Sequence, residues 1–91
     1  MTPLKLPASL LHAQADACLA QWVAQLPAAL PPQVVLDASA LVDFDSSALA
    51  VILGLRRVLS QRGSALHIEC MTPRLRELAT LYGVLDLLHT A

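Results

Sequence analysis

The sequence is poor in charge, because Asp, Glu, Lys and Arg make up only 14% of its 91 residues, against roughly 25% in typical soluble domains. Six basic residues stand against seven acidic ones, which gives a net charge of −1. Binding to DNA or RNA normally requires a clustered excess of Lys and Arg, so we expect no nucleic-acid partner. Intrinsic disorder is also excluded, because disordered chains combine low hydrophobicity with high net charge, whereas 56% of this chain is hydrophobic.

Cysteine and glycine are scarce as well. Two cysteines, Cys18 and Cys70, are too few for a disulfide scaffold. They have no Cys or His neighbours at metal-binding spacing, so we expect no metal site. The glycines at 54, 63 and 83 are scattered and form no phosphate-binding loop. We therefore expect no cofactor and no small-molecule substrate.

Long uninterrupted apolar runs are missing. Residues 17–36 carry no charge and are about as long as a membrane-spanning helix. Pro27, Pro31 and Pro32 break this run, so we expect no direct insertion into a membrane. The first residues also lack the long apolar segment of a signal peptide, which predicts a cytoplasmic protein.

What the sequence does contain is apolar periodicity, which predicts one α/β domain over residues 1–91. Helix-length crossovers between strands favour parallel pairing, so we expect a layered fold in which helices pack on a small, mostly parallel or mixed β-sheet in β-α-β-α-β-α order. We expect Ser9 to cap the first helix. We also expect the Cys70 side chain to face the core from the last strand. We expect strands over residues 4–6 (at an edge), 33–38 (buried on both faces) and 65–71, helices over 9–26, 46–62 and 73–82, and a last helical turn or two over 84–89.

The outer half of the second predicted helix is unusual, because it carries small residues in a row. Ser47, Ala50 and Gly54 follow each other at i, i+3 and i+7, flanked by Leu53 and Arg57. Small residues at this spacing leave a shallow groove that another helix can approach closely. Two interpretations remain open: the groove receives a partner protein, or Gly54 lies under another element of the same domain or is merely tolerated.

The start of this helix carries hydroxyl and carboxyl groups that suggest two further alternatives. Asp45, Ser46 and Ser47 are residue types that cap free backbone N–H groups. Alternatively, Ser46 or Ser47 is a regulatory phosphorylation site, since a phosphate would meet free N–H groups and the positive end of the helix dipole. Spacing alone favours capping over phosphorylation.

Catalytic residues are not predicted. Asp37, Asp43 and Asp45 suggest a phosphoacceptor or magnesium site, but each is also explained as a turn, strand-end or cap residue. A serine nucleophile would need a nearby His and an elbow motif, and the sequence has neither. We therefore expect a non-catalytic protein.

The third predicted helix completes a candidate partner surface. Its apolar stripe comprises Leu75, Leu78, Ala79 and Tyr82, whereas Leu81 falls outside the stripe and extends the apolar patch of the second helix. We expect the following residues to bind a protein partner: Asp45, Ser46, Ser47, Ala50, Leu53, Gly54, Arg57, Arg74 and Leu81.

Residues 34–39, and above all the Asp-Ser-Ser-x-Leu helix start within residues 42–53, resemble the STAS domain. This is the fold of anti-sigma-factor antagonists and of the cytoplasmic ends of sulfate transporters. Residues 72–78 and 81–84 are also similar to this family. The resemblance implies an interaction domain rather than an enzyme.

Two branches of the family are similar to the chain. Residues 78–84 and the short length resemble MlaB-type subunits of bacterial phospholipid ABC transporters, in which a functionally important hydroxyl residue matches Ser46. This branch implies a cytoplasmic subunit that binds the ATPase subunit and is peripheral to the inner membrane through its complex. The alternative is an anti-sigma-factor antagonist that a serine kinase phosphorylates, whose phosphoserine matches Ser47.

Overall fold

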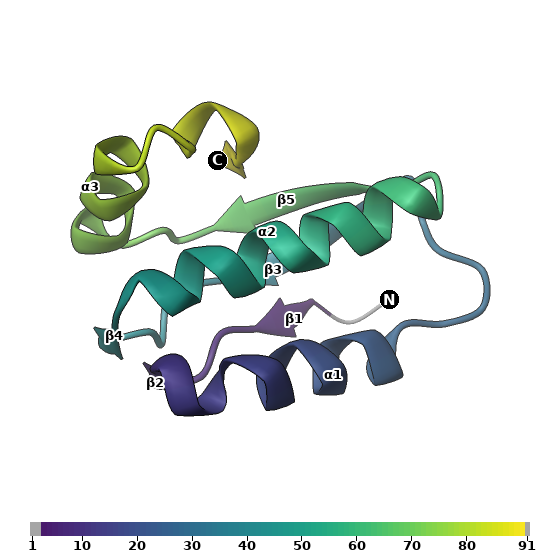
Figure 1. Ribbon diagram of the computed structural model, residues 1–91. Coiled ribbons are helices and arrows are strands. Elements are labelled where there is room, and N and C mark those ends of the chain that lie inside the picture. Colours follow the sequence, from purple (N-terminus) through teal and green to yellow (C-terminus); the bar gives the residue numbers. More distant parts are fainter. Residues whose placement is uncertain (1–2, 91) are drawn as a thin grey trace.

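Within residues 3–90, which the computed structural model describes, four parallel strands form the main sheet (Figure 1). They are β1 (Leu4–Lys5), β3 (Gln33–Asp37), β5 (Ala65–Glu69) and β6 (His89–Thr90). Their order across the sheet, β1-β3-β5-β6, follows their order along the chain. The register places Leu4 beside Leu36 and Leu36 beside Ile68, so apolar side chains on one face of the sheet form a row.

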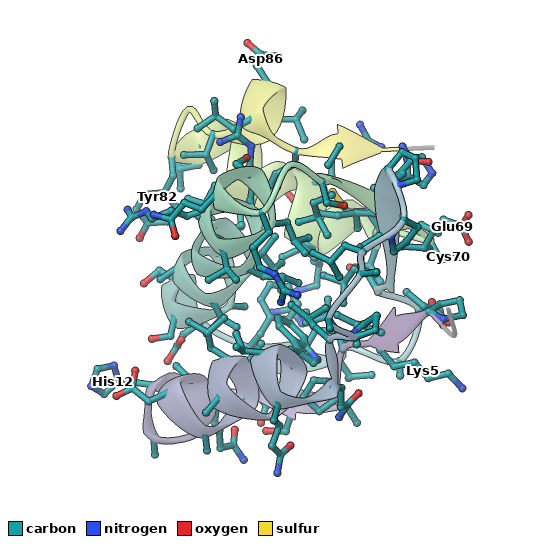
Figure 2. The ribbon with its side chains drawn as sticks, turned by 90° about the vertical axis from the view of Figure 1, so that its right-hand side faces the viewer. Lys5, His12, Glu69, Cys70, Tyr82 and Asp86 are labelled. Carbon is teal, nitrogen blue, oxygen red and sulfur yellow. The ribbon has the colours of Figure 1, made fainter. Side chains whose placement is uncertain are left out.

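Helix α1 (Ala15–Gln25) leads from β1 to β3, and helix α2 (Ser46–Gln61) leads from β3 to β5, so each connects neighbouring strands. Right-handed crossovers between consecutive parallel strands place both helices on the same face of the sheet, as Figure 1 shows. Figure 2 shows Lys5 and Glu69 pointing away from the helices, on the opposite face. The third helix, α3 (Pro73–Leu81), follows β5. The predicted layered α/β fold with a mostly parallel sheet is confirmed.

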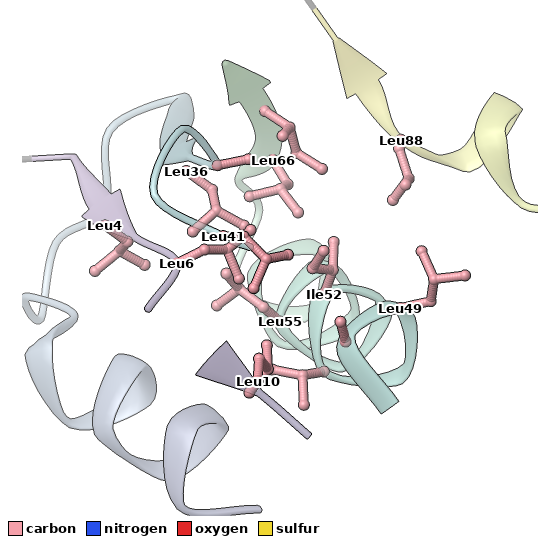
Figure 3. Close-up of a cluster of buried hydrophobic side chains, with 14 of the residues drawn as sticks. Leu4, Leu6, Leu10, Leu36, Leu41, Leu49, Ile52, Leu55, Leu66 and Leu88 are labelled. Carbon is pink, nitrogen blue, oxygen red and sulfur yellow. The ribbon is translucent and has the colours of Figure 1, made fainter. Parts of the chain in front are cut away.

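Helix α2 lies at the centre of the core, because its apolar residues recur at steps of three and four and share one face. Ile52, Leu55 and Leu59 on this face are fully buried. They belong to one cluster with Leu36 and Ile68 of the sheet (Figure 3). The ends of the helix are those predicted from the sequence: Asp45 caps the first turn, and Gly63 follows the last one with a φ of +78°.

The first helix begins later than predicted. Helix α1 starts at Ala15, whereas the sequence suggested a start between Ser9 and His12 with Ser9 as the cap. The intervening residues form a short strand, β2 (Ser9–Leu10), and a 3-10 turn, η1 (His12–Gln14). The Ser9 hydroxyl donates a hydrogen bond to Gln14 Oε1 at 3.3 Å instead of capping the helix.

Strand β2 exists because a distant segment pairs with it. It pairs in parallel with β4 (Asp43–Phe44), and the Ala8 carbonyl accepts the backbone N–H groups of Val42 and Asp43 at 2.9 and 3.0 Å. This arrangement buries Leu10 completely. Burying a leucine stabilises by about 1.5–3 kcal/mol, which outweighs helix propensities of less than about 1 kcal/mol per residue.

The third predicted strand is shorter than expected. Strand β5 ends at Glu69, and Cys70 is exposed with a φ of +59° instead of facing the core. The prediction of Cys70 as a core residue is therefore wrong. The chain must turn here to reach Thr72, whose Oγ1 accepts the backbone N–H of Leu75 at 3.3 Å and caps α3.

The C-terminal segment also differs from the prediction, and so does the face of the sheet that points away from the helices. The predicted last helical turn is present as a 3-10 turn, η2 (Leu85–Leu87), but strand β6, which follows it and pairs with β5, was not predicted. Val35 is half-buried, so β3 is not buried on both faces as predicted. In the described part of the chain, no helix has the length and hydrophobicity needed to cross a membrane.

Candidate protein-interaction site

Asp45 positions the start of α2. Its Oδ1 accepts the backbone N–H of Ser47 at 2.8 Å, and its Oδ2 accepts the backbone N–H of His12 at 3.2 Å. The bond from the Ser47 N–H lowers the pKa of this carboxyl below its ordinary value. Desolvation opposes this shift in part, and the weaker effects of the Ser47 hydroxyl and of His12 lower the pKa further. Asp45 thus acts as the cap and joins α2 to the segment before α1.

The two serines after Asp45 point to different parts of the molecule. Ser46 is exposed and lines two grooves of the surface. Ser47 is half-buried, and its Oγ lies 3.3 Å from Nδ1 of His12. Of the two candidate modification sites, Ser46 is therefore open on the outer surface, whereas Ser47 faces η1.

Gly54 also lies on the side of α2 that faces α1. A Cβ added at this position would lie 3.0 Å from Cδ2 of Leu19, which is closer than ordinary carbon–carbon contact. Of the two interpretations of the small-residue groove, the structure supports packing within the domain at Gly54. The three small residues therefore do not share one surface. Ser47 faces η1 and Gly54 faces α1, whereas Ala50 is exposed.

The exposed side of α2 forms a surface with the end of α3. One groove of about 250 Å³ lies where the second helix approaches the segment after the third, and the following residues line it: Ser46, Leu49, Ala50, Leu53, Tyr82 and Val84. An adjoining groove of about 290 Å³ shares Ser46 and is lined by Phe44, Asp45, Arg74, Glu77, Leu78 and Leu81. We call Ser46, Ala50, Leu53, Leu81 and Tyr82 the α2–α3 surface.

Most of the residues predicted to bind a partner lie together. Asp45, Ser46, Ala50, Leu53, Arg74 and Leu81 line the two adjoining grooves. Arg57 is exposed one helical turn beyond Leu53, on the same side of α2 but outside the groove linings. Ser47 and Gly54 lie on the other flank of the helix, against the segments that contain His12 and Leu19.

Tyr82 is a surface residue that the sequence did not predict. Its spacing predicted a place in the core stripe of the third helix, but α3 ends at Leu81 and the Tyr82 side chain is 56% exposed. Gly83 follows with a φ of +70° and turns the chain away from the helix direction. Gly83 was the signal that Tyr82 belongs to the helix end. Leu81 is 79% exposed, as its position outside the stripe suggested.

Asp37, like Asp45, serves a structural purpose. Asp37 Oδ1 accepts the backbone N–H of Ser39 at 2.9 Å, and this bond lowers the pKa of Asp37. In the described residues, no three His, Cys, Asp or Glu side chains lie together as metal ligands would. His12, Asp45 and Ser47 are neighbours, but Asp45 accepts the backbone N–H of His12 and not a ring N–H, so it does not orient the imidazole as a catalytic triad requires.

Comparisons with known proteins agree with this architecture. A family model described as "Mlab, STAS domain" matches residues 2–89. A sulfate transporter family protein from Wolinella succinogenes has a similar crystal structure, with a TM-score of 0.73 and 14% sequence identity over 91% of this chain. The matched region spans 66% of that protein, and at this identity the likeness shows a shared fold. The curated proteins contain no significant match. The chain belongs to the STAS domain family.

Proposed function

We propose that the chain is a non-catalytic interaction subunit of a bacterial ABC phospholipid transporter, which binds the cytoplasmic ATPase subunit and supports its assembly and activity. STAS domains typically mediate protein–protein interaction. The observation that carries the proposal is the match of residues 2–89 to a family model described as the Mlab type. On this proposal the protein is cytoplasmic and peripheral to the inner membrane through its complex.

The α2–α3 surface supports this proposal, because it has the composition of a docking site. Leu81 and Tyr82 are large apolar side chains that remain exposed, and Tyr82 lines the same groove as Ala50 and Leu53 of α2. Contiguous exposed apolar residues beside polar ones are typical of protein–protein interfaces. Ser46 lies between the two grooves, so we propose that its hydroxyl contacts the ATPase subunit. A phosphate on Ser46 would add negative charge within that contact.

Affinity purification from the native organism tests this function. With the chain tagged at its natural expression level, we expect an ATPase subunit and its permease to co-purify, identified by mass spectrometry. The alternative function, a phosphorylation-switched anti-sigma-factor antagonist, predicts a serine kinase in place of the transporter subunits. It also predicts a single phosphate that the Ser47→Ala variant lacks. Recovery of that kinase without any ATPase subunit would contradict the transporter proposal.

A further inference from the structure

Charge is distributed unevenly over the molecule. Helices α2 and α3 contain four arginines and one glutamate, for a net charge of +3, although the whole chain has a net charge of −1. The rest of the chain, with two basic and six acidic residues, therefore carries −4. The positive charge coincides with the two helices that form the α2–α3 surface.

The arginines lie around the apolar part of this surface. Arg74 lines the groove that contains Leu81, and Arg76 lines a further groove on another side of the same leucine. Arg57 is exposed one turn beyond Leu53. Acidic residues share these grooves, since Asp45 and Glu77 line the first and Glu77 lines the second, whereas Arg57 lies outside both. Charged groups at the rim of an apolar contact select a partner by electrostatic complementarity and accelerate its association.

We propose that the α2–α3 surface binds an acidic amphipathic segment of the ATPase subunit. A bulky apolar side chain of that segment packs beside Ala50 and Leu53, and Asp or Glu residues on either side of it face Arg57 and Arg74. Guanidinium groups pair with carboxylates through two parallel hydrogen bonds. This inference rests on the proposed function and adds the chemistry of the partner segment to it.

Arg57 is the best position for a test of this inference. The structure gives its side chain no hydrogen bond or ion pair with any described residue, so we expect its replacement to leave the fold intact. Arg74 is less suitable, because its guanidinium lies 5.3 Å from the centre of the Phe44 ring and contributes to packing. Lys5 provides a control with the same charge change, since it is exposed on β1 and points away from the helices (Figure 2).

The experiment measures association of the purified chain with the purified ATPase subunit by surface plasmon resonance. At about 50 mM salt we expect Arg57→Glu to slow association about tenfold, and Lys5→Glu to change it less than about twofold. At about 500 mM salt the difference between the variants should largely disappear, because salt screens exposed charges. Thermal unfolding of both variants confirms that they are folded.

Three results would overturn the inference, and they separate it from the proposed function. If the wild-type chain binds the ATPase subunit but Arg57→Glu associates at the same rate as Lys5→Glu, the acidic segment is wrong while the function stands. If the wild-type chain does not bind the ATPase subunit, both are wrong. If Arg57→Glu instead abolishes dimerisation of the chain or its binding to anionic lipid vesicles, the surface serves a second copy or a membrane.

Discussion

Replacing Ala50 with aspartate should lower the affinity of the chain for the ATPase subunit at least about hundredfold. Ala50 is exposed on α2 and lines the groove that also contains Leu53 and Tyr82. Docking of a partner would bury the new carboxylate in an apolar contact without a matching cation, and an acidic partner segment would repel it. Isothermal titration calorimetry with the purified ATPase subunit measures the effect.

Ala20 provides the matched control for this experiment. It is also an exposed alanine within a helix, but it lies on α1 and lines neither groove. Ala20→Asp makes the same chemical change, also within a helix but away from the proposed docking surface. This variant should therefore bind the ATPase subunit like the wild-type chain. Equal affinities of Ala50→Asp and Ala20→Asp would show that the partner docks elsewhere. Gly54 is a poor position for such a test, because a larger side chain there would press on Leu19.

Truncating Leu55 to alanine should destabilise the protein by about 2–5 kcal/mol. The Leu55 side chain is fully buried at the centre of α2 (Figure 3), so its removal leaves a cavity that the surrounding core fills only in part. Domains are typically stable by only about 5–15 kcal/mol, so this loss is a large share of the total. Urea denaturation followed by circular dichroism gives the free energy of unfolding.

Leu81→Ala is the control for the core substitution. It removes the same atoms from a side chain that is 79% exposed, and it should change the free energy of unfolding by less than about 0.5 kcal/mol. The two variants therefore separate the core from the docking surface: Leu55→Ala lowers stability, whereas Leu81→Ala leaves stability unchanged and weakens binding. Similar destabilisation by both substitutions would contradict the assignment of Leu81 to the surface.

Local chemistry explains why the sequence predicted α2 correctly. Asp45 offers a cap, the apolar residues repeat at helical spacing, and Gly63 ends the pattern. Each signal lies within or next to the helix itself. The same holds for α3, where Thr72 and Pro73 mark the first turn.

The features that the sequence analysis missed depend on residues far apart in the chain. Strands β2 and β4 are two residues long, and the Ala8 carbonyl holds them together by accepting the N–H groups of Val42 and Asp43. No local repeat of apolar residues predicts such a pair of strands. The packing of Gly54 likewise depends on where Leu19 of α1 comes to lie. Sequence reasoning therefore located the candidate surface but could not decide which of its small residues were already covered.

Side-chain footprinting of the chain with hydroxyl radicals, alone and bound to the ATPase subunit, tests most directly whether the α2–α3 surface is the docking site. Leu81 and Tyr82 are exposed in the free chain, so both should be oxidised there and protected in the complex. Val23, which is partly exposed on α1, should react equally in both states. Continued oxidation of Leu81 and Tyr82 in the complex, with protection of Val23, would contradict the account.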